Sequence, residues 1–525
     1  MVEDSVEKKG IHKLLSDRGN LRVSLIIQGT IIGFITGIVI VLNRIAISKF
    51  SHVFKEIYLY SKGSPIKVIG VFLLLALMGW ITGVMVKKEP MISGSGIPQV
   101  NAILLGKLNV NWVKVLVLKF IGGTMALVAG LSVGREGPSV QMGAAIAQGV
   151  SNSSEKAPMK KGFLVTSGAA AGLAAAFNSP LSGMIFVLEE VHRSFSPLVL
   201  LPAMAATLMA DFVTKQFLGM DPALKFMDVS VIPLEYYWTL VILGVLTGAI
   251  AIFFTKGVVI SQNIYGRLKK VPIEVKIMIP FLITGVVGFL APQLLGGGHE
   301  IIISLYGSDI SILMLIALFL IKFILVLICF GSGVPGGIFL PMLLLGSILG
   351  DIFGIIICNL ANIPSTFIIN FIILAMAGYF AAVVKAPVTA IVLITEMTGS
   401  FEHLLAISIV VFIAYITSDL LRSEPVYEVL LDRLLKNVGT PLKSGSMKNT
   451  LLEVGIEMGS IVEGKRIKNI DWPAECLLVA IKRGGKEIIP KGEIRILSGD
   501  YLVVLVNDSI SSEILEALKG LTLVD

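Results

Sequence analysis

Ten apolar stretches recur between residues 21 and 421 of this 525-residue chain. They occupy residues 23–43, 66–86, 113–133, 163–188, 237–260, 276–297, 311–330, 338–360, 366–384 and 404–421. An apolar run of about 18 residues or more is long enough to cross the hydrocarbon core of a bilayer as a helix. The sequence therefore predicts an all-α polytopic membrane protein with at least ten passes through the lipid bilayer.

Composition excludes other classes of protein. Charged residues make up 15% of the chain, against about 25% in ordinary soluble domains. A disordered chain is excluded, and the net charge of +7 is spread too thinly to indicate a nucleic-acid partner. The three cysteines form no CxxC or histidine-paired pattern, so no disulfide framework and no metal site are expected. We expect neither catalytic residues nor a cofactor, and therefore no enzyme.

The character of the sequence changes after Tyr427. Residues 438–525 alternate short β-rich runs with glycine turns at ordinary charge density, which is typical of a small α+β domain. The N-terminus has no cleavable signal, and its basic residues favour cytoplasmic termini. We predict a cytoplasmic N-terminal segment (1–20), two membrane repeats (21–220 and 221–435) and a cytoplasmic C-terminal domain (436–525).

The predicted membrane part contains an internal repeat. Residues 119–143 match residues 322–346 at one offset of 203, with a lysine, two glycines and a proline in common. AAAFNSPLSGMIFVLEE (174–190) matches AAVVKAPVTAIVLITEM (381–397) at an offset of 207, and GSG at 94–96 matches GGG at 296–298. Single matches carry little weight because Gly, Pro and Ala are common in membrane helices, but three blocks in the same order indicate two homologous halves.

Clusters of Gly and Pro break the apolar stretches at 94–99, 134–138, 178–180 and 331–341. Broken backbone at membrane depth is tolerated only where it is buried in protein or lines a cavity. Broken segments at corresponding places in two halves are typical of transporters that bind their substrate between repeats near the bilayer midplane. From the residues alone, the relative orientation of the repeats stays open.

A half-helix that starts inside the membrane presents unpaired backbone N–H groups and the positive end of its dipole, which suit an anion. The TVGYG filter of potassium channels is absent from the sequence. Ser95, between two glycines, is suited to donate its hydroxyl to a dehydrated ion. The alternative is that Ser95 is simply a small residue at a helix contact.

Several charged residues fall within or beside the apolar stretches. Glu136 stands at the expected start of a helix, where its carboxylate and an anion would compete for one place. Protonation of Glu136 would free that place; the alternative is an exposed carboxylate at a helix N-terminus. Glu189 and Glu190 end an apolar run, where a solvated or salt-bridged pair is the ordinary explanation. Lys119 and Lys322 are expected to snorkel or to make buried hydrogen bonds.

GSGIP (94–98), GREGP (134–138) and GGIFLP (336–341) occur in the order and spacing found in the CLC family of chloride channels and proton-coupled chloride transporters. The chain resembles this family over about residues 20–435. The resemblance implies a homodimer in which each subunit holds its own anion pathway between two inverted repeats. It also implies that chloride and protons are the transported ions.

The resemblance assigns roles position by position. Ser95 and Tyr427 correspond to the serine and tyrosine of the central anion site. Ile338 and Phe339 correspond to residues that offer backbone N–H groups to the anion. Serine at the position of Ser95 is typical of chloride-transporting members, whereas proline accompanies nitrate and methionine accompanies fluoride.

GREGP adds Arg135, Glu136 and Gly137 to the anion-binding set, and Glu136 resembles the external gating glutamate. Glu190, the second glutamate of LEEVHRSF, resembles the internal proton-transfer glutamate that exchangers carry and channels generally lack. Protons would then pass between Glu190 and Glu136. The sequence departs from many relatives at Gln99, where they have a glutamate.

Residues 445–510 resemble the C-terminal regulatory domain (TrkA-C) of potassium-transport regulators, with the Gly499–Asp500 turn before the last strand as the clearest mark. The resemblance implies a cytoplasmic regulatory module open to a small-molecule regulator. No glycine-rich phosphate loop identifies that ligand.

The leading hypothesis is a proton-coupled chloride antiporter in a prokaryotic plasma membrane. A passive anion channel gated by Glu136 is the first alternative, favoured if Glu190 is salt-bridged and idle. A potassium transporter, suggested by the C-terminal domain alone, is disfavoured by the anion-type motifs and the missing filter.

Overall fold

The computed structural model describes residues 2–154, 158–193, 196–224, 226, 229–306, 310–439, 449–483, 486–507 and 511–522. The chain divides into two compact units, Met1–Leu434 and Leu435–Asp525. The side chains of residues 1–20, the expected cytoplasmic N-terminal segment, lie outside the described residues. The backbone of residues 2–20 forms the beginning of the first helix.

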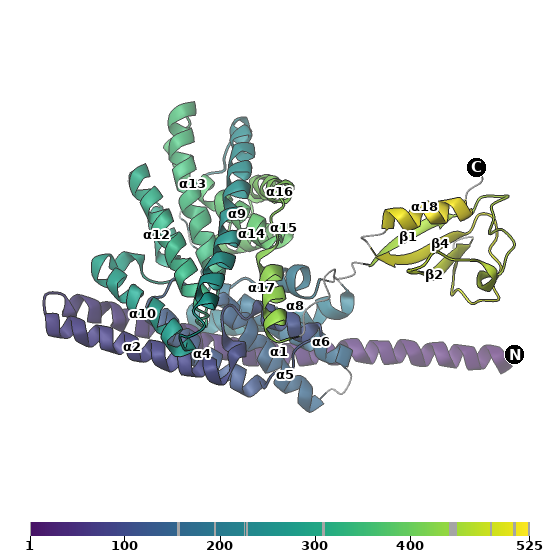
Figure 1. The fold of residues 1–525 in the computed structure, drawn as a ribbon, viewed down its shortest axis with the longest axis horizontal. Coiled ribbons are helices and arrows are strands. Elements are labelled where there is room, and N and C mark those ends of the chain that lie inside the picture. Colours follow the sequence, from purple (N-terminus) through teal and green to yellow (C-terminus); the bar gives the residue numbers. More distant parts are fainter. Residues whose placement is uncertain are drawn as a thin grey trace. The chain divides into compact units, whose positions relative to one another are not determined.

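The first unit is built from helices, several of them short or interrupted (Figure 1). They are α1 (Val2–Ser61), α2 (Pro65–Lys88), α3 (Ile97–Leu104), α4 (Trp112–Val128), α5 (Glu136–Ser154), α6 (Pro158–Phe177), α7 (Pro180–Phe186), α8 (Pro197–Leu218), α9 (Tyr237–Arg267), α10 (Ile273–Leu290), α11 (His299–Leu305), α12 (Ile312–Gly331), α13 (Phe339–Ala361), α14 (Ile368–Val384), α15 (Pro387–Thr398), α16 (Leu404–Leu420) and α17 (Val426–Asn437). Shorter turns are η1 (Pro90–Ile92), η3 (Leu234–Tyr236), η4 (Pro292–Leu294) and η5 (Ser365–Phe367), all 3-10, and the π-helical η2 (Val187–Val191).

In the described part of the chain, eight helices are long and apolar enough to cross a membrane, and α15 and α16 are shorter apolar helices. The protein is therefore a multi-pass membrane protein, as the sequence predicts. The predicted stretches miss one of the eight, α8, which has the lowest mean hydropathy of the set, 1.6. Its ion pair between Asp211 and Lys215, at 2.7 Å, explains how a membrane helix tolerates these charges.

The predicted span 163–188 is not one helix. α6 ends at Phe177, Asn178 adopts a left-handed φ of 57°, and α7 begins at Pro180. Proline cannot continue a helix because it has no N–H group and it restricts the residue before it. The second half repeats this break at Lys385, with φ 68°, before Pro387 of α15. The break that the sequence predicts at 178–180 is confirmed, and the same break recurs in the second half.

Contacts between the two halves confirm the internal repeat and show that it is inverted. Gly134 and Gly337, which the sequence alignment pairs, form an antiparallel bridge with two reciprocal N–H···O bonds of 2.7 Å. Equivalent residues of two repeats pair antiparallel only where a local two-fold axis relates the repeats. The chain therefore runs in opposite directions in the two halves at this point.

Glutamates at equivalent positions cap helices of the opposite half. The Glu189 carboxylate accepts hydrogen bonds of 2.6–3.2 Å from the first-turn N–H groups of α15 and from the hydroxyl of Thr389. The Glu396 carboxylate accepts bonds of 2.5–3.1 Å from the first-turn N–H groups of α7 and from the hydroxyl of Ser182. Unpaired N–H groups and the positive dipole end favour a carboxylate at both places. The expectation of a solvated or salt-bridged Glu189 is therefore wrong.

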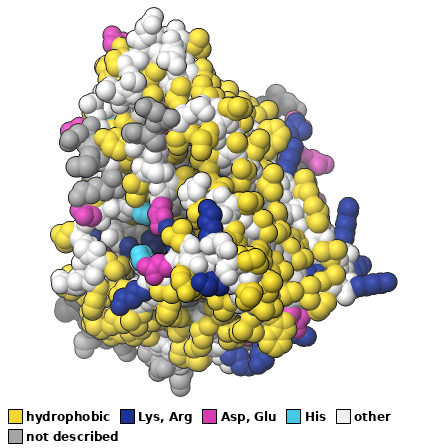
Figure 2. Space-filling view, turned by 90° about the vertical axis from the view of Figure 1, so that its left-hand side faces the viewer, with side chains coloured by type: hydrophobic (Ala, Val, Ile, Leu, Met, Phe, Trp, Pro, Cys, Tyr) yellow, Lys and Arg dark blue, Asp and Glu magenta, His cyan; other side chains and the backbone are white. Residues whose placement is uncertain are grey.

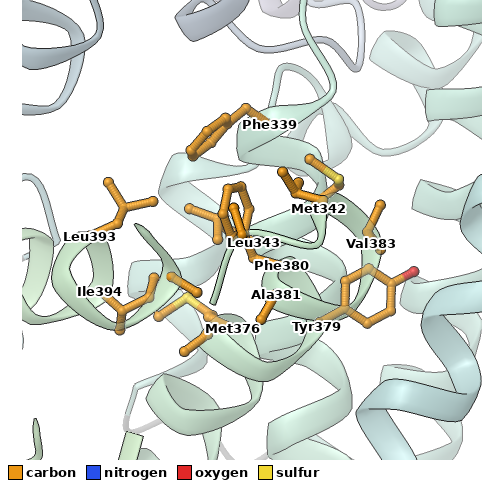
Figure 3. Packing of buried hydrophobic residues seen from close by; sticks show 14 of the residues in the cluster. Phe339, Met342, Leu343, Met376, Tyr379, Phe380, Ala381, Val383, Leu393 and Ile394 are labelled. Carbon is orange, nitrogen blue, oxygen red and sulfur yellow. The ribbon is translucent and has the colours of Figure 1, made fainter. Parts of the chain in front are cut away.

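The centre of the first unit is formed by α13 and α14, which are the most deeply buried of the spanning helices. Both are apolar on all sides, as expected for helices surrounded by other helices. Side chains of α13, α14 and α15 interlock there (Figure 3): Phe339, Met342, Leu343, Met376, Tyr379, Phe380, Leu393 and Ile394. This packing fixes the N-terminus of α13, which carries two of the predicted anion-site residues.

The described residues of the second unit form a four-stranded antiparallel sheet in the order β1-β4-β2-β3. Its elements are β1 (Asn449–Gly455), η6 (Ile467–Asn469), β2 (Cys476–Arg483), β3 (Lys486–Ile488), β4 (Tyr501–Asn507) and α18 (Ser511–Thr522). α18 packs against β1 and β4 (Figure 1), and Leu518 joins the core formed by Leu502, Val504 and Val506. The predicted small α+β domain is confirmed.

The Gly499–Asp500 turn holds two strands of this sheet together. Gly499 has a left-handed φ of 83°, and the buried Asp500 carboxylate accepts two bonds from Arg483, at 2.7 and 2.8 Å, and one from the Leu497 N–H, at 2.8 Å. Burial opposes ionisation of Asp500, but the Arg483 guanidinium and the Leu497 N–H outweigh it and hold the pKa of this carboxyl below its ordinary value.

Candidate ion-binding site

Helix N-termini from both repeats meet beside the Gly134–Gly337 bridge. α5 begins at Glu136, α13 begins at Phe339, and α3 follows Gly96. A β-carbon on Gly137 would collide with the hydroxyl and carbonyl oxygens of Ser95, and one on Gly337 would lie 3.1 Å from the backbone nitrogen of Gly137. The backbone thus approaches closely enough for several unpaired N–H groups to face one ion, and their dipoles favour an anion.

The carboxylate of Glu136 lies at this meeting point. Glu136 is fully buried, and its Oε2 atom lies beside Gly134 and the backbone N–H of Leu340. Neither carboxylate oxygen makes a hydrogen bond of ordinary geometry to the described residues. The carboxylate therefore occupies a place suited to an anion. The alternative of an exposed helix-terminal carboxylate is wrong.

Ser95 and Tyr427 bring two hydroxyl groups to the same region. Ser95 is 2% exposed and Tyr427 is fully buried, and the two hydroxyls lie side by side. Neither hydroxyl oxygen has a partner of good hydrogen-bond geometry among the described residues. A buried hydroxyl without a partner costs free energy, so such a pair is typical of a site that binds a ligand.

Aromatic rings surround these hydroxyls. The ring centroid of Phe339 lies 4.5 Å from that of Phe380 and 5.7 Å from that of Phe186, and Phe186 lies 6.3 Å from Tyr427. Ile338, the residue before α13, is fully buried. The rings make the surroundings of the hydroxyls apolar, so an ion here would meet backbone N–H groups, the two hydroxyls and the Glu136 carboxylate as its polar neighbours.

Arg135 borders a cavity of about 370 Å³. Figure 2 shows a largely hydrophobic face of the molecule with a hollow where basic, acidic and histidine side chains gather. The cavity is lined by residues that include His52, Lys55, Gly134, Arg135, His299, Glu300 and Leu340. Because Gly134 and Leu340 also flank the Glu136 carboxylate, the cavity leads towards Glu136.

Glu190 is a second buried carboxylate near Tyr427. It belongs to the π-helical turn η2 and is 4% exposed. Its Oε1 atom makes no hydrogen bond to any described residue and lies 3.9 Å from a guanidinium nitrogen of Arg193. Tyr427 lies within electrostatic range of both Glu190 and Glu136. Both predicted proton carriers are therefore near Tyr427.

The two buried lysines hold the broken segments in place. Lys119 donates to the carbonyl oxygens of Ile92 and Gly94, at 2.8 and 2.7 Å. Lys322 donates to the equivalent Leu294 and Gly296 carbonyls, at 2.9 and 2.7 Å. The prediction of buried hydrogen bonds is confirmed for both lysines.

Sequence reasoning missed two charged residues of the site. Arg193 and Glu428 form an ion pair of 2.6 Å beside Glu190. Arg193 follows Glu190 by three positions, which is a usable signal; nothing in the sequence pairs it with Glu428.

Gln99, where many relatives have a glutamate, is buried and donates a hydrogen bond to the Ser93 carbonyl at 2.7 Å. It thereby stabilises the chain before α3. Among the described residues, no group of three or more His, Cys, Asp or Glu is arranged to hold a metal ion.

Comparison with known sequences matches each of the two units to a family. Residues 78–419 match the family described as voltage gated chloride channel, and residues 451–519 match the TrkA-C domain. The H(+)/Cl(-) exchange transporter ClcA of Vibrio parahaemolyticus is 34% identical over 444 residues, which cover 82% of this chain and 94% of the relative. The transporter of the same name from Yersinia pestis is 35% identical over 368 residues, which cover 69% of this chain and 77% of the relative.

Solved structures resemble the first unit. A slow cyanobacterial Cl-/H+ antiporter shares 30% identity at a TM-score of 0.75, over 79% of this chain and 99% of that protein. A eukaryotic CLC transporter shares the fold at 22% identity and a TM-score of 0.65. That match covers 79% of this chain and 74% of the eukaryotic protein. The inverted repeats, the broken helices and these matches together show that the chain belongs to the voltage-gated chloride channel family.

Proposed function

We propose that the protein is a proton-coupled chloride antiporter. The observation that carries the proposal is the pair of buried carboxylates, Glu136 and Glu190, both within electrostatic range of Tyr427, with Glu136 among helix N-termini that suit an anion. A passive pore needs no second buried carboxylate. The relatives named as exchange transporters support the same class.

Chloride binds between the two repeats. The hydroxyls of Ser95 and Tyr427 donate to it, and so do the backbone N–H groups of Ile338 and Phe339. Gly137 allows the close backbone approach, because a side chain there would collide with Ser95. Arg135 lies next to Glu136 and adds positive potential at the end of the site that faces the cavity. These groups replace the hydration shell of the ion inside a dry region.

Glu136 is the gate and the outer proton carrier. An ionised carboxylate and a chloride ion cannot share the same N–H groups, because like charges repel at short distance. When chloride displaces the carboxylate towards the cavity, Glu136 takes a proton from the outer solution. The protonated side chain no longer competes with the anion, so the ion can leave.

Glu190 exchanges protons with the inner solution, and Tyr427 and the bound anion lie between it and Glu136. The same carboxylate, Glu136, admits chloride and carries the proton. Movement of chloride in one direction is therefore tied to movement of protons in the other.

The assembly and the second unit complete the proposal. Each chain carries Ser95, Glu136, Phe339 and Tyr427 itself, so a homodimer in the bilayer would contain two complete pathways. We propose that the second unit, with its TrkA-C match, is a cytoplasmic regulatory module for a small molecule, and that both termini are cytoplasmic. The domain limits given in the sequence analysis belong to this proposal.

One observation favours the alternative of a passive chloride channel gated by Glu136. Arg193 lies 3.9 Å from the Glu190 carboxylate, and a firm ion pair would keep Glu190 ionised and idle. The pairing of Arg193 with Glu428 at 2.6 Å is shorter, which weakens that alternative.

Proton movement in liposomes tests the proposal. Purified protein is reconstituted, a chloride gradient is imposed, and proton movement is followed for the unmodified protein and for Glu190→Gln. The antiporter predicts uphill proton movement that the substitution abolishes. Chloride flux without proton movement in either protein would make it a channel.

A further inference from the structure

Arg193 lies between two carboxylates at the inner end of the proposed proton route. One guanidinium nitrogen, Nη1, lies 2.6 Å from Oε1 of Glu428, and the other, Nη2, lies 3.9 Å from Oε1 of Glu190. Glu190 is buried, whereas the side chains of Arg193 and Glu428 are 46% and 41% exposed. One cation at the protein surface is thus within reach of a buried carboxylate and of an exposed one.

The backbone holds Arg193 in this place. Its φ of 55° lies in the left-handed region, which is unfavourable for a residue with a side chain. Its Nε donates to the carbonyl of Glu190 at 3.3 Å. Glu428 follows Tyr427 directly and is carried by α17. The Arg193–Glu428 pair therefore joins the turn that carries Glu190 to the helix that carries Tyr427.

We propose that Arg193 is a positioning residue that moves between Glu428 and Glu190, and thereby sets how readily Glu190 takes up a proton from the inner solution. This rests on the proposed exchange function. When Glu190 is ionised, the guanidinium moves towards it. When Glu190 accepts a proton from water, its attraction for Arg193 is lost and the guanidinium returns to Glu428. One proton is gained and one ion pair is exchanged for another.

The other groups around Glu190 leave this role to Arg193. Glu189 is acidic and caps α15, Tyr427 presents a neutral hydroxyl, and His192 pairs with the Thr166 hydroxyl at 3.0 Å. Of the packed helices, α3 carries no charged side chain, and the charged residues of α6 are Lys160 and Lys161 at its start. The balance between Arg193 and the two neighbouring acids therefore controls the charge of Glu190.

The proposal predicts opposite effects for the two partners. Glu428→Gln removes the competing carboxylate, so Arg193 stays with Glu190 and favours its ionised form. The pH of half-maximal proton transport then falls by about one unit. Arg193→Gln leaves Glu190 among acids, so the same midpoint rises by about one unit. A purely structural role would not move the midpoint in opposite directions.

The experiment measures proton and chloride fluxes in liposomes at a series of pH values, equal on both sides, so that Glu136 experiences the same change in every protein. Arg193→Lys keeps the charge and should restore most of the original profile. Lys87→Gln, which breaks a 2.6 Å ion pair with Glu274 elsewhere in the membrane unit, is the matched control and should leave the midpoint unchanged.

Retained chloride flux shows that each variant is folded. Midpoints that move in the same direction, or that stay in place for both variants, would overturn the role of Arg193. A shift as large in Lys87→Gln would overturn it as well. If the unmodified protein moves no protons, the antiporter proposal itself fails, and the two failures are distinguishable in one data set.

Discussion

The two repeats of the membrane unit share their scaffold and differ in their chemistry. Equivalent glycines form the Gly134–Gly337 bridge, and equivalent lysines hold equivalent broken segments. Glu189 and Glu396 cap helices of the opposite half with the same set of bonds. Contacts that recur in both halves are thus the ones that build the fold.

The two carboxylates proposed to carry protons, together with Ser95, occur in the first half only, although Ile338, Phe339 and Tyr427 of the second half are proposed to bind the anion. Glu136 of the first half corresponds to Phe339 in the second, Ser95 corresponds to Gly297, and Glu190 corresponds to Met397. A symmetric scaffold with symmetric charges would bind ions in the same way from both faces of the membrane. The asymmetry gives the site an outer gate and an inner proton carrier.

The largest effect is expected from removing the negative charge of Glu136, because the corresponding residue of the second half is Phe339. Glu136→Gln should reduce proton transport by at least about 100-fold, because a general acid–base group of the proton route is lost. Chloride transport should continue, because a neutral side chain no longer competes for the anion place. Paired pH-electrode and chloride-electrode recordings from liposomes measure both. Retained proton coupling in this variant would contradict the role of Glu136.

Gly137 tests the close backbone approach at the proposed anion site. Gly137→Ala should lower chloride transport by about 10-fold or more, since the added methyl group collides with the oxygens of Ser95 and cores tolerate such overpacking poorly. Gly520→Ala in α18, where a β-carbon meets open space, is the control. Chloride efflux from liposomes is the measurement. Equal chloride rates in both variants would show that the contact is not needed.

The symmetric carboxylates offer a matched pair. Glu189→Gln and Glu396→Gln should each cost about 1–3 kcal/mol of stability, because a charge-assisted helix cap is weakened in both. Neither should change the number of protons moved per chloride. Thermal unfolding in detergent together with the flux ratio checks this. If only one variant lost the coupling of protons to chloride, the two carboxylates would not have equivalent roles, although their contacts match.

The smallest effect on transport is expected from the second unit. Asp500→Asn weakens a bidentate contact with Arg483 and should destabilise the sheet by about 1–2 kcal/mol while ion fluxes remain unchanged. The pKa of Asp500 is depressed below its ordinary 3.8, so its ionised form stabilises the sheet above that pH. The stabilisation is lost as the pH falls through the depressed value. Hydrogen exchange of β4 in the full chain measures it, and unchanged protection of β4 would refute the role.

Much of this architecture follows from local sequence. Long apolar runs, glycine–proline breaks and matched blocks lead to the spanning helices and to the repeat. Hydropathy alone reads residues 163–188 as one stretch, and the break at Asn178 follows instead from the NSP cluster at 178–180, because a proline cannot continue a helix. α8 is missed because its Asp211–Lys215 pair lowers its hydropathy.

The site was predictable to a lesser degree. Ser95, Glu136 and Tyr427 stand in or near recognisable motifs, and the structure brings them together as expected. The pairing of Arg193 with Glu428 joins residues more than 230 positions apart and follows no motif. The inverted orientation of the repeats follows from the family resemblance and not from the internal repeat itself, because matched blocks of sequence do not say how the two halves are oriented.

The most direct test compares two neighbouring glutamates of the first repeat. Glu190 corresponds to Met397 in the second repeat, whereas Glu189 corresponds to Glu396. Proton and chloride fluxes are measured in liposomes under a chloride gradient for Glu190→Gln and for Glu189→Gln. We expect that Glu190→Gln abolishes proton movement and keeps chloride flux, whereas Glu189→Gln keeps the ratio of protons to chloride. Loss of coupling in both variants, or in neither, would contradict the claim that ion chemistry lies in the residues that the two repeats do not share.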